Sequence, residues 1–114
     1  MIKDYMIVGE FDEGMTSGVA KDILDDMDEL TDSRHPVIRL FIDSTGGYVH
    51  SLLSLLSVLS MAKDHGVVVE THVIGDAYSC GSMLAMSGSK GHRYISEFSH
   101  HLIHWGEIGS YSQS

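Results

Sequence analysis

The sequence predicts an α/β domain of repeated β-α units built on a mainly parallel sheet. Short β-branched runs alternate with stretches of helical periodicity, in the order strand, helix, strand, helix, strand, helix, strand. The chain has 114 residues, is 43% hydrophobic and 20% charged, and contains one proline, which suits one domain with one modest core. We expect residues 1–114 to form a single domain whose site lies at the carboxyl ends of the strands.

The first half of the chain contains two predicted strands with an amphipathic helix between them. Residues 5–8 (YMIV) form a short strand that ends at Gly9, and residues 36–43 (PVIRLFID) form the next strand. From Met15 to Leu30, apolar residues recur at helical spacing while aspartates occupy the other sides, so this helix has one wet face. Its apolar positions are Val19, Ile23, Met27 and Leu30.

The second half begins with a helix over residues 48–66 that is apolar nearly all round, which predicts a buried helix with Gly66 as its C-terminal cap. The β-branched run at residues 67–74 (VVVETHVI) predicts a central strand. The glycines of the Gly46-Gly47 turn and Gly75 are expected at strand ends. The remaining predicted elements are a short helix over 79–87 and strands over 92–95 and 100–104.

Charge and cysteine content exclude several classes of protein. The net charge of −9, from 16 acidic and 7 basic side chains, argues against a nucleic-acid or anionic-membrane partner. The lone Cys80 cannot form an internal disulfide, which suits a reducing compartment. No signal-peptide pattern opens the chain, and the longest apolar stretch carries four serines and is too short for a membrane span. We expect a soluble cytoplasmic protein.

Ser79 is the candidate nucleophile, in the stretch GDAYSCGSML at residues 75–84. A serine at the first turn of a helix lies beside free backbone N–H groups, which could hold the oxyanion formed when it attacks a carbonyl. The alternative is that Ser79 only caps the helix. Ala77 stands at the first glycine position of a G-x-S-x-G elbow, which disfavours a hydrolase of that fold.

Histidines supply the candidate general bases. His104 ends an apolar run at a predicted strand end, while His72 lies inside the central strand. A histidine is more often an ordinary surface or core residue than a general base, and spacing alone does not single out His104. Neighbouring His100 and His101 diverge on a strand, and no further ligand stands at suitable spacing, so we predict no metal site.

Three motifs in order carry a family resemblance: DSTGG, then AYSCGSMLAMSGSKGHR, then LIHWG. The chain resembles the proteolytic subunit of the Clp protease, ClpP, and its relatives with the crotonase-like fold. The matching family motifs are an N-S-P-G-G turn, an A-A-S-M-G-A serine motif followed by A-G-A-K-G-K-R, and M-I-H-Q-P. Ser79 and His104 are 25 residues apart, as in the family. The first strand and helix also look like the family's, so the resemblance covers nearly the whole chain.

The resemblance implies Ser79 as nucleophile and His104 as general base. It implies an oxyanion hole from the backbone N–H groups of Gly47 and Cys80, with the Gly46-Gly47 turn beside the substrate. Cys80 stands where the family has methionine, which raises a cysteine nucleophile as an alternative. The expected activity is cofactor-free, ATP-independent cleavage of unfolded or short polypeptides by a homo-oligomer.

The chain departs from the family pattern after His104. The resemblance places an orienting aspartate well beyond it, whereas Glu107 is the only acid that follows in this sequence. Glu107, Asp76 and Asp43 are the possible substitutes, and without one we expect weakened or absent turnover. The family's C-terminal handle and its N-terminal axial loops have no counterpart in these residues. These two departures favour a single ring, a smaller oligomer or a monomer, and argue against partnership with an AAA+ unfoldase.

Three functions therefore stay open. The first is a reduced ClpP-type serine endopeptidase, and the second is a non-catalytic ClpP-like module that oligomerises with or regulates a full-length ring. The third is a phage protease of the head-maturation type, which shares the fold. An acyl-CoA enzyme of the wider crotonase fold fits less well, because those chains are much longer.

Overall fold

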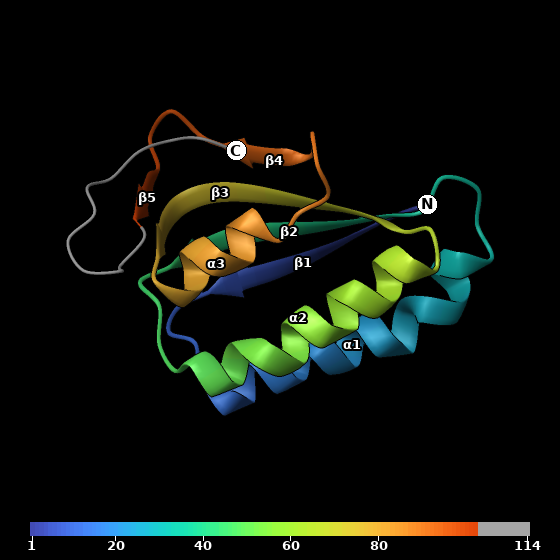
Figure 1. Ribbon diagram of the computed structural model, residues 1–114, viewed down its shortest axis with the longest axis horizontal. Coiled ribbons are helices and arrows are strands. Elements are labelled where there is room, and N and C mark those ends of the chain that lie inside the picture. Colours follow the sequence, from blue (N-terminus) through green and yellow to red (C-terminus); the bar gives the residue numbers. More distant parts are fainter. Residues whose placement is uncertain (103–114) are drawn as a thin grey trace.

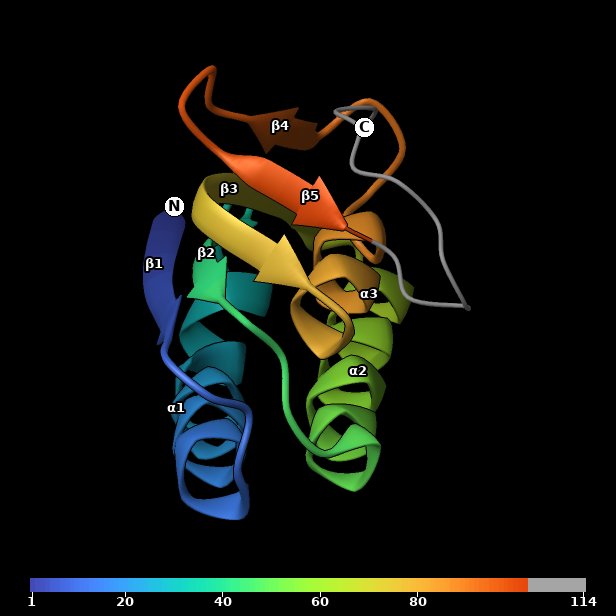
Figure 2. The same cartoon turned by 90° about the vertical axis from the view of Figure 1, so that its left-hand side faces the viewer.

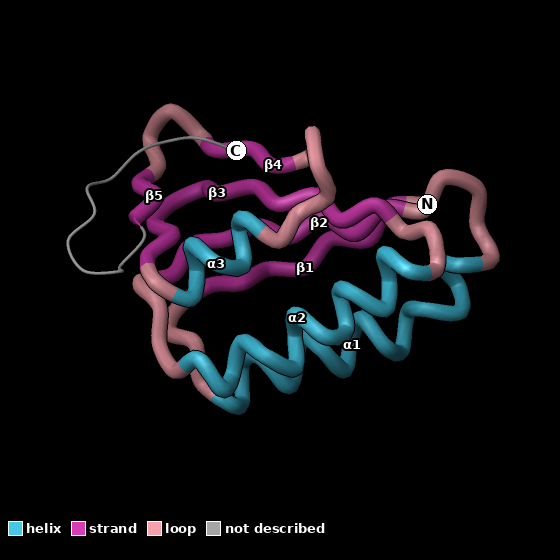
Figure 3. Tube along the Cα trace, in the orientation of Figure 1, coloured by secondary structure: helices cyan, strands magenta, loops and turns pink. Residues whose placement is uncertain are grey.

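The computed structural model describes the backbone of residues 1–102 and the side chains of residues 1–99. Its strands alternate with helices up to β4, which β5 follows without a helix between them, and every strand pair in the sheet is parallel (Figures 1 and 3). The predicted α/β class with a mainly parallel sheet is confirmed. The elements are β1 (Ile2–Val8), α1 (Glu13–Thr31), β2 (Val37–Ser44), α2 (Val49–Asp64), β3 (Val68–Tyr78), α3 (Cys80–Met86), β4 (Arg93–Ile95) and β5 (His100–Leu102).

The sheet has the order β1-β2-β3-β4, and β5 pairs with β3 beyond the end of β4. The helices all lie against one face of this sheet (Figures 1 and 2). Side chains that point toward the helices are buried on each central strand, as Leu40 and Val69 illustrate. The opposite face carries a stack of Phe41, His72 and Tyr94, with ring centroids 5.0 and 4.7 Å apart. Within residues 1–102, no helix covers that face.

Helix α1 begins with a conventional cap. Asp12 is extended, and its Oδ1 accepts a hydrogen bond from the Met15 N–H at 2.8 Å. Along the helix Ile23 and Leu30 are fully buried, while the aspartates between them face outward or lie at the margin. The predicted amphipathic helix with one wet face is therefore confirmed.

Helix α2 is buried on one side only, which corrects the prediction of a buried helix. Leu55 and Leu59 are in the core, but Leu53 and Met61 are 54% and 46% exposed. The helix packs beside α1 and against β3 and α3, and nothing in the described part of the chain lies on its outer side. Its predicted glycine cap is confirmed, because Gly66 has φ +85° and the chain reverses there with paired end hydrogen bonds.

Strand β3 is central, as predicted, but it runs on past the expected end. Gly75 lies inside β3 rather than in a turn, which corrects the expectation for this glycine. The strand can continue because Gly75 leaves room for the carboxyl group of Asp43, which lies where a Cβ would be. No helix in the described residues is long and apolar enough to cross a membrane.

Candidate active site

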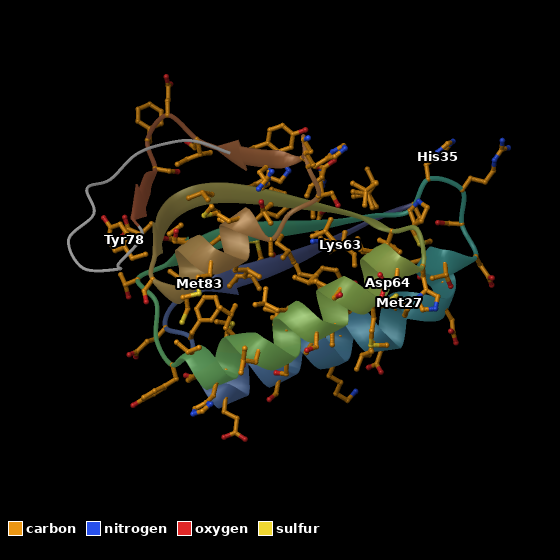
Figure 4. The ribbon with its side chains drawn as sticks, in the orientation of Figure 1. Met27, His35, Lys63, Asp64, Tyr78 and Met83 are labelled. Atoms are coloured by element: carbon orange, nitrogen blue, oxygen red, sulfur yellow. The ribbon has the colours of Figure 1, made fainter. Side chains whose placement is uncertain are left out.

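Ser79 joins the end of β3 to the start of α3 in a strained backbone conformation. Its φ of 53° and ψ of −114° make it one of two non-glycine residues with positive φ in residues 1–102. Such a conformation costs about 1–3 kcal/mol and persists only when the surroundings enforce it. The labelled Tyr78 and Met83 mark the strand side and the helix side of this junction (Figure 4).

The structure does not support the interpretation of Ser79 as a helix cap. Its side chain makes no capping hydrogen bond to the first turn of α3. The backbone instead supplies the first contact of the helix, since the Met83 N–H donates to the Ser79 carbonyl at 3.0 Å. The half-buried hydroxyl is thus not committed to holding the helix end.

The Gly46-Gly47 turn packs directly against Ser79. A Cβ at Gly46 would lie 2.9 Å from the Ser79 Cβ and 3.0 Å from the Tyr78 carbonyl oxygen, and Gly46 has φ +107°. Only glycine fits this close approach without displacing the serine. The buried Ser44 Oγ accepts a hydrogen bond from the Gly46 N–H at 3.1 Å, which fixes the turn from within.

Phe11 clamps the other side of the turn. Its N–H donates to the Gly46 carbonyl at 2.8 Å, and its carbonyl accepts from the Tyr48 N–H at 3.1 Å. Neither bond uses the Gly47 N–H. Because the polar groups of successive residues in extended chain point to opposite sides, the N–H and C=O of Gly47 face away from Phe11. A Cβ at Gly47 would lie 2.2 Å from the Phe11 carbonyl oxygen, so this residue must also be glycine.

Cys80 connects this turn to α3. Its thiol donates to the Gly47 carbonyl at 3.4 Å, which places the side of Gly47 that faces away from Phe11 beside the start of α3. As the first residue of the helix, Cys80 has a backbone N–H without an intrahelical acceptor. The side chain is fully buried in the core, which argues against the alternative of a cysteine nucleophile.

The structure thus brings together four of the predicted site residues, Gly46, Gly47, Ser79 and Cys80. The fifth, His104, lies outside the described residues. Among the described residues, β5 runs parallel to β3, and its Leu102 lies opposite Tyr78, the residue before Ser79.

His72 is separated from this site. It lies within β3, seven residues before Ser79, and is about 20 Å away from it at the usual rise of a strand. On the open face of the sheet its Nε2 lies 3.0 Å from Oε1 of Glu70. This position removes His72 as a candidate base for Ser79.

The candidate orienting acids are placed differently from one another. Asp43 Oδ1 accepts a hydrogen bond from the Asp76 N–H at 2.9 Å, so this carboxylate is engaged with the backbone of β3. Asp76 lies near the Tyr78 hydroxyl, and partial desolvation together with the nearby negative charge of Asp76 raises the pKa of Tyr78 above its ordinary 10.0. Glu107 lies outside the described residues.

No group of three or more metal-ligating side chains comes together among the side chains that the structure describes. The cluster considered from His100, His101 and His104 lies outside them. Two residues of the site were not expected from the sequence, Phe11 and Ser44. Ser44 had a local signal, since serine often hydrogen-bonds the backbone two residues on. Phe11 had none, because its contact is between distant parts of the chain.

Ser79 thus lies on a strained strand-to-helix turn of an α/β domain, with the backbone of Gly46 packed against it. The family model of Clp protease matches residues 3–114. The chain belongs to the Clp protease family.

Curated relatives agree with this assignment. The chain is 30% identical to the ATP-dependent Clp protease proteolytic subunit of Leuconostoc citreum, in an alignment that covers 100% of this chain and 56% of the relative. It is 32% identical to the subunit of the same name from Streptococcus mutans, over 91% of this chain and 51% of the relative. The chain spans about half the length of the curated relatives it matches.

Proposed function

We propose that this chain is a ClpP-like serine endopeptidase that cleaves unfolded or short polypeptides, with Ser79 as nucleophile and His104 as general base. The observation that carries the proposal is the strained, uncapped Ser79 beside the Gly46-Gly47 turn. The strain is retained although an ordinary capped start would be more stable, as expected of a residue held for function. The relatives named as proteolytic subunits support the same chemistry.

The proposed reaction proceeds through an acyl-enzyme. Ser79 Oγ attacks the peptide carbonyl carbon while His104 takes its proton, and the oxyanion accepts hydrogen bonds from the Gly47 and Cys80 N–H groups. The peptide C–N bond then breaks, and His104 returns the proton to the leaving amine. Water, deprotonated by His104, releases the acyl group from Ser79. No cofactor or nucleotide enters these steps.

We propose that turnover depends on an acid that orients His104, because a serine and histidine without such an acid lose about 10⁴ in turnover. Loss of an oxyanion-hole donor costs less, about 10²–10³. Phosphonylation of Ser79 by a reactive probe requires only the first attack of the nucleophile, so it reports on Ser79 more directly than steady-state peptide cleavage does.

Labelling with a fluorophosphonate tests the proposal. The wild-type chain should be labelled, and Ser79→Ala and His104→Ala should abolish or strongly reduce labelling. Ser60→Ala, which changes an exposed serine on α2, is the matched control and should label like the wild type. A folded wild-type chain that labels no faster than Ser79→Ala would reject the peptidase.

A second candidate is a ClpP-like module that assembles with copies of itself or with a full-length ring without cleaving. The exposed apolar residues Val49, Leu53 and Met61 on α2 favour an assembling surface. Light scattering of the chain alone and with a full-length relative separates the two candidates. Mixed or homo-oligomers without labelling would favour this module, whereas a labelled monomer would reject it. The cytoplasmic location stays a prediction.

A further inference from the structure

We propose that Asp43 is the positioning residue that brings Ser79 to the Gly46-Gly47 turn, and that its carboxyl oxygen acts as a hydrogen-bond acceptor rather than as a charge. This inference rests on the proposed function, which it deepens by naming the group that aligns the site.

The first observation is a change of register between β2 and β3. From Val37 to Ile42 the two strands pair residue by residue, and Ile42 lies opposite Val73. Beyond this point Ser44 lies opposite Ala77, so β3 uses two more residues than β2 over the interval that contains Asp43. Such an irregularity re-aims the end of a strand. Ser79 follows two residues after Ala77, so its position depends on this shift.

The second observation is that the Asp43 side chain holds the irregularity. Its Oδ1 accepts a hydrogen bond from the Asp76 N–H at 2.9 Å. The same carboxyl group lies against the Cα of Gly75, where a Cβ would be 2.3 Å from Oδ1 and 2.5 Å from Cγ. Gly75 and Asp76, which lie in the interval where β3 has two extra residues, therefore both contact the Asp43 carboxyl group.

The third observation is that Asp43 is also tied to the turn that faces Ser79. Its carbonyl accepts from the Gly9 N–H at 3.0 Å, which fixes the chain that leads to Phe11, the clamp of the turn. The next residue, Ser44, accepts from the Gly46 N–H. Asp43 thus links the strand that presents the serine to the turn that faces it.

Only the acceptor is needed for this role. The contact of Oδ1 is to a neutral backbone N–H, which an amide oxygen can also receive. Asp43→Asn should therefore preserve the alignment, and Asp43→Ala should lose it. An acid that oriented His104 would behave differently, because its charge would be essential.

The test compares fluorophosphonate labelling rates, per folded molecule, of Asp43→Ala and Asp43→Asn. We expect Asp43→Ala to lower the rate about tenfold or more, since misplacement by about 1 Å can cost about 10²-fold, and Asp43→Asn to stay within about threefold of wild type. Asp4→Ala removes another exposed aspartate, on β1, and is the matched control. Equal losses in both Asp43 variants would show that charge matters and overturn the proposal, as would no loss in either.

A double-mutant cycle that combines Gly75→Ala with Asp43→Ala provides a second test, which does not depend on the effect of either substitution alone. Gly75→Ala should slow labelling about tenfold in the wild-type background, because the new Cβ meets the Asp43 carboxyl group. In the Asp43→Ala background the same change should cost less than about threefold, since the carboxyl group is gone. Additive losses would overturn the proposal.

A readout that does not need activity separates this proposal from the proposed function. If the wild-type chain does not label, the peptidase fails, and amide NMR decides the role of Asp43. The Asp76 amide should lose exchange protection, and the Ser79 and Cys80 signals should shift, in Asp43→Ala but not in Asp43→Asn. Unchanged Ser79 and Cys80 signals in Asp43→Ala would overturn the proposal.

Discussion

Helices α1 and α3 both follow a strand of the same sheet, but they begin in opposite ways. At α1, Asp12 is extended, caps the Met15 N–H through Oδ1, and is followed by the acidic Glu13 in the first turn. At α3, Ser79 has positive φ, its hydroxyl makes no capping bond, and no acidic residue stands in the first turn. The N-terminus of α1 favours stability, because Asp12 accepts a hydrogen bond from a free N–H group and the acidic side chains interact favourably with the positive end of the helix dipole.

The N-terminus of α3 leaves its backbone N–H groups and the positive end of its dipole without such partners. An uncapped first turn keeps N–H donors and a positive potential that a developing oxyanion can use. The protein retains strain at Ser79, worth about 1–3 kcal/mol, and packs Gly46 against it while Gly47 lies against Phe11. The difference teaches that serine before a helix is not by itself a cap, and that its backbone angles tell the two roles apart.

The largest effect should come from a substitution that pushes the Gly46-Gly47 turn away from Phe11. Gly47→Ala places a Cβ 2.2 Å from the Phe11 carbonyl oxygen, so the turn must move. We expect a loss of about 3 kcal/mol in the free energy of unfolding, with loss of probe labelling. Chemical denaturation measures the first quantity.

Gly9→Ala is the control for this prediction. Gly9 also has positive φ, at +93°, but a Cβ there meets nothing within 4 Å. It should cost only the backbone strain, about 1–2 kcal/mol. Equal losses at Gly9 and Gly47 would mean that contact with Phe11 does not matter.

Removing the cap of α1 should have an intermediate effect. Asp12→Ala leaves the Met15 N–H without its acceptor, and we expect it to lower the free energy of unfolding by about 1 kcal/mol. Labelling of Ser79 per folded molecule should not change, since α1 contributes stability only. A Tm measurement with parallel labelling checks both expectations. A large loss of labelling would contradict the expectation that the cap of α1 affects stability but not Ser79.

The smallest effect should come from an ion pair that lies at the N-terminus of neither α1 nor α3. Arg39 holds Asp4 through two hydrogen bonds of 2.7 and 2.9 Å, and these lower the pKa of Asp4 below its ordinary 3.8. A lowered pKa in the folded state adds stability that is present above the unfolded pKa and lost as pH falls through the folded one. Because the pair is exposed, its contribution is small.

Asp4→Asn measures this contribution through the pH dependence of unfolding. The variant should be slightly less stable than wild type at pH 6, and the gap should close as pH falls below about 3.8. A gap that widens toward acid pH would contradict the assignment of the shift to Arg39.

Local patterns were sufficient for much of the fold. The period of apolar residues located α1, β-branched runs located the central strand, and Gly66 marked the end of α2 as predicted. Motif order also selected the four site residues that the structure brings together, Gly46, Gly47, Ser79 and Cys80.

What the sequence could not provide depends on contacts between distant residues. Gly75 lies within a strand because the carboxyl group of Asp43, from the neighbouring strand, occupies its empty side. The exposure of Leu53 follows from how α2 packs on the sheet, which its own composition does not determine. Whether Ser79 caps or is strained depends on the Gly46 turn and on Phe11, which no local propensity describes.

The stability of Ser79→Gly tests most directly whether Ser79 is held in strain rather than used as a cap. With φ of 53° and ψ of −114°, glycine adopts this conformation more easily than serine. We expect the free energy of unfolding in denaturant to rise by about 1 kcal/mol, while fluorophosphonate labelling is lost. A variant less stable than wild type would show that the Ser79 side chain stabilises the start of α3, and would contradict this account of the site.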